Sequence, residues 1–265
     1  MNPEVPRHKP AALVVAHPGH ELRVHGWLER ARPLVFVLTD GSGRGAPRLD
    51  STTRLLAAAG AAPGSIYGRF SDRGCYSALL GGEIERFVAL AEELAEALRE
   101  AGTETVAGDA LEGFNPSHDV CRLVVDAAVA RLGREGRDLV NLQFPLESHP
   151  DGGTGQADDP AAHLGLDLYL DDDAFDRKLA AARAYPEMAG EVEAAFARFG
   201  PAAFRHERLA PAATPPLELL YRTTPFFESH GERRVAEGHY REVLRGRKHL
   251  GPVAAGLGEW AQGSR

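Results

Sequence analysis

The chain has 265 residues, with 30 Lys and Arg against 38 Asp and Glu and a formal net charge of -8. This length suits one large α/β domain, and the acidic balance offers no overall attraction for nucleic acid. The two cysteines, Cys75 and Cys121, form no Cys-x-x-Cys, so we expect ordinary buried residues and no disulfide framework. No stretch approaches the ~18 apolar residues of a membrane span or the apolar run of a signal peptide, so we predict a cytoplasmic protein without a membrane partner.

Residues 12–21 (ALVVAHPGHE) predict a buried parallel strand that ends in polar side chains. Open α/β sheets keep their sites at such strand ends. The apolar spacing after Glu21 indicates a helix, so His17 and His20 would lie on the strand-to-helix turn. Two imidazoles at that spacing can share one metal ion.

A second buried strand is predicted over 33–40 (PLVFVLTD). Strand, helix and strand within this length imply a right-handed parallel crossover, so the ends of the two strands would lie side by side. Asp40, at the end of the second strand, either lines the site or caps the turn, and both interpretations stay open.

A helix is predicted over 48–60, a short strand over 65–68, and a long helix over 82–101 whose apolar stripe belongs to the core. A strand over 103–107 precedes the segment DALEGFNPSHD (109–119). The apolar periodicity after this segment predicts a helix with His118 and Asp119 in its first turn.

The last part of the chain is predicted to hold a strand over 137–145 and a glycine-rich excursion over 147–160 of the kind that closes over sites. His149 in this excursion is interpreted as a surface residue. After this excursion we predict a strand over 166–170, a helix around Lys178 and another over 189–199. A further strand and a mostly helical segment over 226–249 complete the chain's predicted elements. The fold class is therefore α/β.

Two of these segments resemble the signature of the LmbE-like (PIG-L) family of zinc-dependent deacetylases, which remove acetyl groups from N-acetylglucosamine-type sugars. The first strand of that family ends in Ala-His-Pro-Asp-Asp-Glu, and residues 16–21 read AHPGHE. The family's second motif, Glu-Gly-Gly-His-Pro-Asp-His-Asp, corresponds to EGFNPSHD at 112–119. The resemblance covers roughly residues 10–145 and implies a Rossmann-like, mostly parallel sheet with helices on both faces.

We predict a single domain over 1–265. Because 146–265 has no nucleophile–base pair or glycine-rich phosphate loop of its own, it would add C-terminal strands and helices that build the substrate wall. The resemblance assigns His17, His20 and His118 as ligands of one Zn²⁺, or of another divalent metal. Glu21 and Asp119 would orient the ligand histidines from behind.

Further site residues are implied by the same comparison. Asn115 stands where the family has a histidine that steadies the oxyanion, and its amide would keep part of that role. Gly19 replaces the aspartate that serves as the family's base. Glu112, and after it Asp40, would then relay the proton. Two further residues are candidates for substrate binding, Arg48 and Asp72.

The predicted function is a metal-dependent hydrolase that deacetylates an N-acetylated sugar or sugar conjugate through a zinc-bound water. The alternative, favoured by Gly19 and Asn115, is a catalytically degenerate relative that binds a glycan or nucleotide-sugar without hydrolysing it. A dinucleotide-binding oxidoreductase is excluded because the first strand-to-helix turn has no Gly-x-Gly-x-x-Gly. The expected partner is a small molecule or a glycan, and the sequence does not set the oligomeric state.

Overall fold

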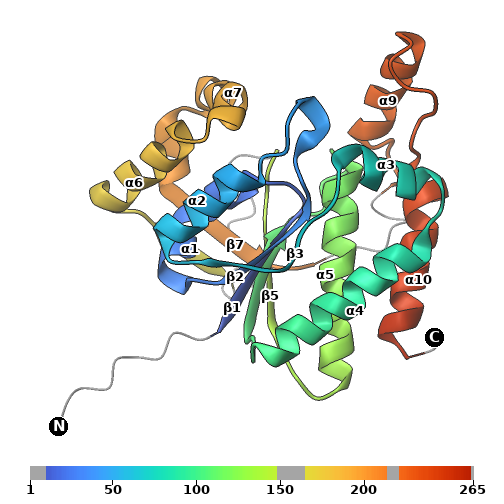
Figure 1. Cartoon of the computed structure of the whole chain (residues 1–265), viewed down its shortest axis with the longest axis horizontal. Helices are drawn as coiled ribbons and strands as arrows, with labels where there is room; N and C mark the ends of the chain where they lie inside the picture. Colours follow the sequence, from blue (N-terminus) through green and yellow to red (C-terminus); the bar gives the residue numbers. More distant parts are fainter. Residues whose placement is uncertain (1–9, 148–164, 214–220, 264–265) are drawn as a thin grey trace.

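The computed structural model describes residues 10–147, 165–213 and 221–263. Its centre is a seven-stranded sheet in the order β3-β2-β1-β4-β5-β7-β6 (Figure 1). The first five strands are parallel, and β7 pairs antiparallel with both β5 and β6. The strands are β1 (Ala11–Val15), β2 (Leu34–Thr39), β3 (Ala62–Phe70), β4 (Thr105–Asp109), β5 (Val140–Phe144), β6 (Leu166–Tyr169) and β7 (His206–Pro211). This arrangement confirms the predicted fold class.

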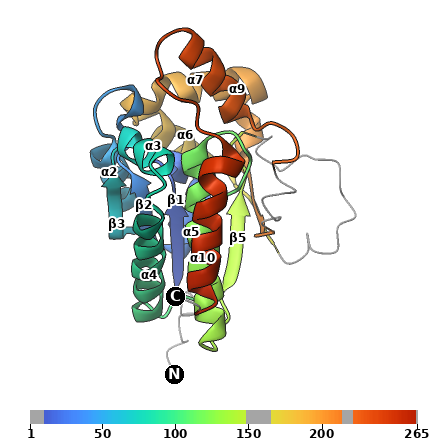
Figure 2. The same ribbon diagram turned by 90° about the vertical axis from the view of Figure 1, so that its right-hand side faces the viewer.

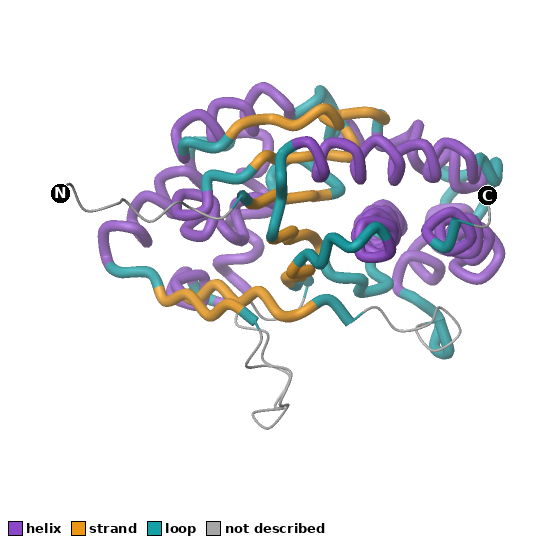
Figure 3. The backbone as a smooth tube through the Cα atoms, turned by 90° about the horizontal axis from the view of Figure 1, so that it is seen from below, coloured by secondary structure: helices purple, strands orange, loops and turns teal. Residues whose placement is uncertain are grey.

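Helices cover both faces of the sheet (Figure 3). Alternate residues of a strand point to opposite faces, so Leu13 and Val15 of β1 pack on one side and Ala12 and Val14 on the other. The helices are α1 (His25–Ala31), α2 (Leu49–Ala59), α3 (Asp72–Leu80), α4 (Ile84–Glu100), α5 (Pro116–Arg134), α6 (Asp172–Arg183), α7 (Ala189–Phe199), α9 (Phe226–Ala236) and α10 (Gly251–Ala261). The shorter helical turns are η1 (His20–Val24), η2 (Ser42–Arg44), η4 (Pro186–Met188), η5 (Pro201–Arg205) and η6 (Gly246–Leu250).

The order of the strands explains where a site can form. The chain runs outward from β1 to β2 and β3, then crosses back to β4 on the other side of β1. The strand order therefore reverses between β1 and β4, and doubly wound folds bind their ligands at the carboxyl ends of the strands at such a point. Figure 2 shows β5 pointing toward the same end of the molecule, where α3, α7 and α9 lie.

Three local predictions differ from the structure. The helix expected after Glu21 is preceded by the 3-10 turn η1, and β3 is longer than the predicted 65–68. Helix α3 begins at Asp72, where the sequence indicates a loop, and its N-cap Ser71 accepts a hydrogen bond from the backbone N–H of Gly74 at 3.0 Å. A serine in that position is a helix-start signal.

The C-terminal segments are attached directly to the N-terminal core. β7 extends the sheet beside β5, and α10 packs against α4 and α5. The single-domain interpretation rests on this continuity and stays a prediction. His149 and nearly all of the excursion predicted over 147–160 lie outside the described residues.

Two smaller expectations concern cysteines and membrane helices. Cys75 and Cys121 are both buried free thiols, as the sequence predicted. Among the helices that the structure describes, none is long and apolar enough to cross a membrane.

Candidate metal centre

Three histidine rings gather at the carboxyl ends of β1 and β4. His17 directly follows β1 and Ala16, His20 begins η1, and His118 lies in the first turn of α5, which follows β4. The ring centres are 5.3 Å apart for His17 and His20, 5.0 Å for His17 and His118, and 4.7 Å for His20 and His118. The two sequence segments that predicted a metal site therefore meet in space.

Carboxylates hold two of these rings from behind. The His17 Nδ1 lies 2.7 Å from the Thr39 hydroxyl and 3.1 Å from Asp72 Oδ1. The His20 Nδ1 lies 2.9 Å from Asp109 Oδ2, which also accepts the backbone N–H of Ala16 at 2.8 Å. If both rings carry their proton on Nδ1, each donates a hydrogen bond to its carboxylate. Nε2 then keeps its lone pair, and a neutral imidazole binds a metal through such a nitrogen.

Burial favours the neutral forms of His17 and His118. It lowers the pKa of His17 and lowers that of His118 well below the ordinary value. Burial acts in the opposite direction on Asp72, but its hydrogen bonds to His17 and to the backbone N–H of Gly43 outweigh it, so the pKa of Asp72 lies well below its usual value. A neutral imidazole is the form that ligates a metal, and an ionised Asp72 can hold the His17 ring in place.

Two observations bear on whether a metal fits here. Among the described residues, no group of three or more His, Cys, Asp and Glu side chains has its donor atoms already placed to hold an ion. However, three imidazoles around one tetrahedral zinc have ring centres about 5 Å apart, given Zn–N bonds of about 2 Å, and the observed separations match that value. The buried Nδ1 of His118 also has no hydrogen-bond partner within the part of the chain that the structure describes. The spacing of the three rings therefore suits a single ion, whereas their donor atoms do not converge on one point in this structure.

The two carboxylates expected behind the ligands make other contacts. Glu21 Oε2 accepts the backbone N–H of Gly19 at 2.7 Å. Asp119 accepts the N–H of Glu112 at 3.2 Å and of Gly113 at 3.1 Å, and its other oxygen accepts the Tyr221 hydroxyl at 2.9 Å. Burial raises the pKa of Asp119 to about 6. These two residues shape the loops that carry the histidines, whereas Asp72 and Asp109 contact the rings themselves.

The candidate catalytic residues occupy three different positions. Asn115 is the N-cap of α5: its side-chain oxygen Oδ1 accepts the N–H of Ser117 at 2.8 Å, and its side-chain nitrogen Nδ2 lies 3.4 Å from His17 Nε2. The Glu112 carboxylate accepts the N–H of Leu146 at 2.8 Å at the exit of β5. Asp40 Oδ1 accepts the N–H of Ser42 at 2.9 Å and so caps its turn. Of the three, Asn115 has a side chain directed at the histidine cluster.

The two candidate substrate-binding residues both make hydrogen bonds to other residues of this chain. Arg48 donates from Nε to the Gly41 carbonyl at 2.9 Å and from Nη1 to the sulfur of Met188. Asp72 uses its second oxygen to accept the N–H of Gly43 at 2.7 Å. Their proposed roles toward substrate stay predictions.

Gly19 has a backbone conformation that excludes most other residues. Its φ is 106° and its ψ is -19°, which only glycine adopts readily. A Cβ at this position would lie 2.8 Å from the sulfur of Met188 in η4. Met188 therefore fills the space into which a side chain at position 19 would extend.

Asp109 is the site residue that sequence reasoning missed. It is the last residue of β4, after the buried strand segment Val106–Gly108, and is itself 1 % exposed. A carboxylate that ends a buried strand at this edge of the sheet is the signal that would have identified it.

No family model matches this chain, and neither does any curated protein sequence. Solved structures do match. The A40926 pseudoaglycone deacetylase Dbv21 aligns with 78% of this chain and 100% of its own, at 17% identity and a TM-score of 0.54. The conserved protein TT1542 from Thermus thermophilus aligns with 78% of this chain and 96% of its own, at 20% identity and a TM-score of 0.52. A zinc-inhibited form of teicoplanin deacetylase Orf2 aligns with 88% of this chain and 95% of its own, at 10% identity and a TM-score of 0.50.

The fold is one that known deacetylases share. At identities of 10–20%, the shared feature is the path of the backbone.

Proposed function

We propose that this chain is a metal-dependent hydrolase of the LmbE-like family that deacetylates an N-acetylated sugar or sugar conjugate. The observation that carries the proposal is that His17, His20 and His118 gather at the carboxyl ends of β1 and β4. The fold that holds them is similar to that of a known deacetylase. Support for a metal also comes from Orf2, one of those deacetylases, which has a zinc-inhibited form. The ion would be Zn²⁺ or another divalent metal.

The three histidines would hold the ion through neutral ring nitrogens. Asp72 and Asp109 fix the orientation of two rings and increase the basicity of the nitrogens that face the ion. When bound, such an ion supplies Lewis-acid chemistry, by polarising a carbonyl group and favouring the ionisation of water.

The side-chain amide of Asn115 would act as an oxyanion stabiliser. Its oxygen is occupied as the N-cap acceptor of α5, which turns its N–H groups toward the cluster. Such a donor stabilises the negative charge that develops on an amide carbonyl oxygen during hydrolysis. Glu112 is our first choice as the residue that relays a proton to the departing amine, and Asp40 is the second.

One observation favours the alternative of a binding protein that does not hydrolyse its glycan. Gly19 cannot take a proton, and Met188 occupies the volume beside it. In this case the histidine cluster and the fold would be retained while turnover would be absent.

Replacing Asn115 by Ser tests the hydrolytic proposal. Serine is a good N-cap, so α5 should keep its start, while the amide donor is lost. We expect the release of acetate from a panel of N-acetylated sugars to fall by about 100- to 1000-fold in kcat, with the thermal unfolding midpoint nearly unchanged. If the variant keeps the full turnover of the wild type, Asn115 does not stabilise the oxyanion. If the wild type itself shows no turnover, the result favours the alternative of a protein that binds a glycan without hydrolysing it.

A further inference from the structure

A buried histidine closes the turn that leads into α10. His249 belongs to η6, a single π-helical turn, and is 5% exposed. Its ring Nδ1 accepts the backbone N–H of Arg245, the N-cap of this turn, at 2.8 Å. Because Nδ1 is the acceptor, the ring proton lies on Nε2. Only a neutral imidazole makes this contact, since a protonated ring would direct an N–H donor at another donor.

The other nitrogen of this ring is not satisfied. Within the part of the chain that the structure describes, the buried Nε2 of His249 has no hydrogen-bond partner. The Oε1 of Glu242, on the loop before η6, lies 3.9 Å from Nε2, which is beyond hydrogen-bonding distance. A protonated ring would gain this carboxylate as a partner by moving toward it, and would give up the N–H of Arg245. The charge of the ring therefore selects between two partners.

The surroundings of His249 keep the ring neutral at neutral pH. Burial lowers the pKa of His249, and the charge of the neighbouring Lys248 lowers it further. Glu242 and Glu228 act in the opposite direction without reversing the effect. The closed turn is therefore the form present at neutral pH.

The turn that His249 closes also holds α9. Glu228 of α9 accepts the backbone N–H of Gly246 at 2.8 Å through one oxygen and the Arg245 guanidinium at 3.0 Å through the other. Glu232, one turn further along α9, pairs with the same guanidinium. The residues at the start of η6 thus connect His249 to α9.

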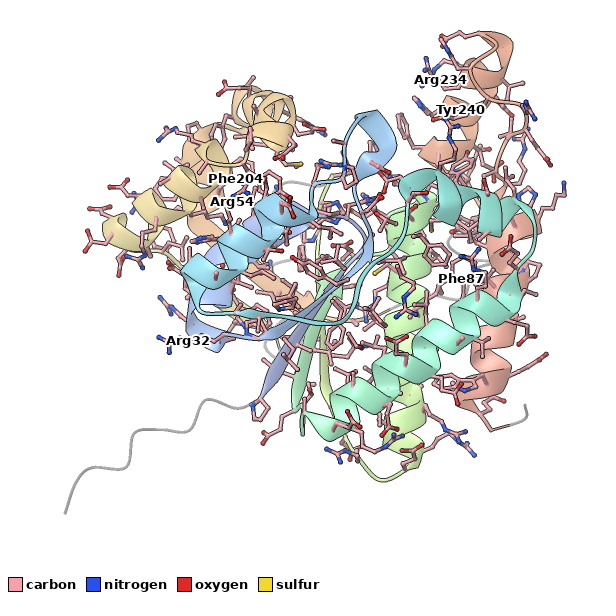
Figure 4. All side chains as sticks on the ribbon, viewed as in Figure 1. Arg32, Arg54, Phe87, Phe204, Arg234 and Tyr240 are labelled. Atoms are coloured by element: carbon pink, nitrogen blue, oxygen red, sulfur yellow. The ribbon has the colours of Figure 1, made fainter. Side chains whose placement is uncertain are left out.

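Helix α9 borders the candidate metal centre. Its start lies beside the loop between β4 and α5, because a Cβ on Gly113 would lie 3.3 Å from the Cβ of Pro225. Beyond its other end, the ring of Tyr240, labelled in Figure 4, has its centre 5.8 Å from the Arg234 guanidinium carbon and 5.8 Å from the ring centre of Tyr76 in α3. Arginine and tyrosine side chains keep their charge state between about pH 5 and 8. These contacts therefore do not make the position of α9 sensitive to pH in this range.

We propose that His249 is the sensor of a pH-dependent latch, which holds η6 and α9 together when the ring is neutral and releases them when the ring is protonated. The inference does not depend on the proposed function. In the released form the ring reaches water and takes up a proton with a pKa of about 6.5, whereas the pKa is lower in the closed form. The closed form therefore loses stability as the pH falls below about 6.5. At about pH 5.5 the ratio of released to closed form should be about 10-fold higher than at about pH 7.5.

Hydrogen exchange of the backbone amides, followed by mass spectrometry of peptic fragments, measures this ratio. Exchange over 226–236 and 245–250 would be compared at about pH 7.5 and about pH 5.5, after correction for the intrinsic dependence of amide exchange on pH. The wild type should lose about 10-fold in protection of both segments at the lower pH. His249→Asn, whose Oδ1 takes the place of Nδ1 but binds no proton, should change by less than about 2-fold. His239→Asn is the matched control: His239 is an exposed histidine of the same segment, so this variant should respond like the wild type.

The proposal is overturned if the wild type keeps its protection at the lower pH, or if His249→Asn loses protection as the wild type does. Loss confined to 245–250 would also contradict it, because other contacts would then hold α9. A second measurement needs no variant: the NMR resonances of the His249 ring should titrate together with the loss of protection of the Arg245 amide. Titration of the ring without that loss would exclude the latch.

Discussion

Replacing Glu207 by Gln is expected to lower the free energy of unfolding by about 3–5 kcal/mol. The Glu207 carboxylate is 1% exposed and lies 2.7 Å from the ammonium group of Lys178, which is 4% exposed. It also accepts the backbone N–H groups of Gly26 and Trp27, each at 2.8 Å. An amide would leave the buried lysine without its counter-charge and would direct N–H donors at backbone donors.

Chemical denaturation of the variant and of Glu29→Gln would measure this effect. Glu29 pairs with Arg177 at the surface, where the arginine side chain is 56% exposed. We expect a loss below about 1 kcal/mol for that exposed pair. The buried Lys178–Glu207 pair links β7 and α6 to the start of α1. Equal losses of unfolding free energy in both variants would contradict a greater stabilising effect of this buried pair than of the exposed one.

Gly19→Asp, which introduces the carboxylate found at this position of the LmbE-like motif, is expected to destabilise the chain without raising its rate of acetate release. A non-glycine residue at this φ of 106° costs roughly 1–3 kcal/mol. The contact of 2.8 Å with the sulfur of Met188 adds an overpacking cost of about 1–3 kcal/mol. The new carboxylate would therefore be placed in a distorted turn.

The matched variants separate these costs. Gly19→Ala carries the same backbone and contact penalties without a carboxylate, and Met188→Ala combined with Gly19→Asp relieves the contact alone. Thermal unfolding and acetate release should be measured for all three. A stable Gly19→Asp single variant with a large gain in turnover would contradict this prediction and would identify the native chain as a degraded deacetylase.

The histidine cluster was predictable because it depends on the ends of strands. His17 and His20 follow a buried apolar run, and His118 follows another such run by one loop. Parallel strands bring their carboxyl ends to the same edge of a sheet. The resemblance to the LmbE-like signature assigned the three histidines to one site, and the strand ends explain physically why the two motifs meet. The order of the strands was not predicted.

The partners of these histidines were not predictable in the same way. Asp72 and Asp109 lie 55 and 89 residues from the rings that they contact. Asp72 was predicted to bind substrate because residues 70–72 resemble a loop that carries an aspartate in the LmbE-like family, whereas the structure places Asp72 at the start of α3. The contact between Gly19 and Met188 depends on where η4 lies after a long excursion, and no local pattern encodes that path.

Metal content per chain tests the central claim most directly. The purified wild type, dialysed after exposure to zinc, should contain about one divalent ion per chain by elemental analysis. His118→Ala should contain almost none, because it removes one of three ligands. His239→Ala should equal the wild type, because that ring is exposed beyond the end of α9. A metal-free wild type, or equal metal in all three proteins, would contradict the assignment of His17, His20 and His118 as a metal centre.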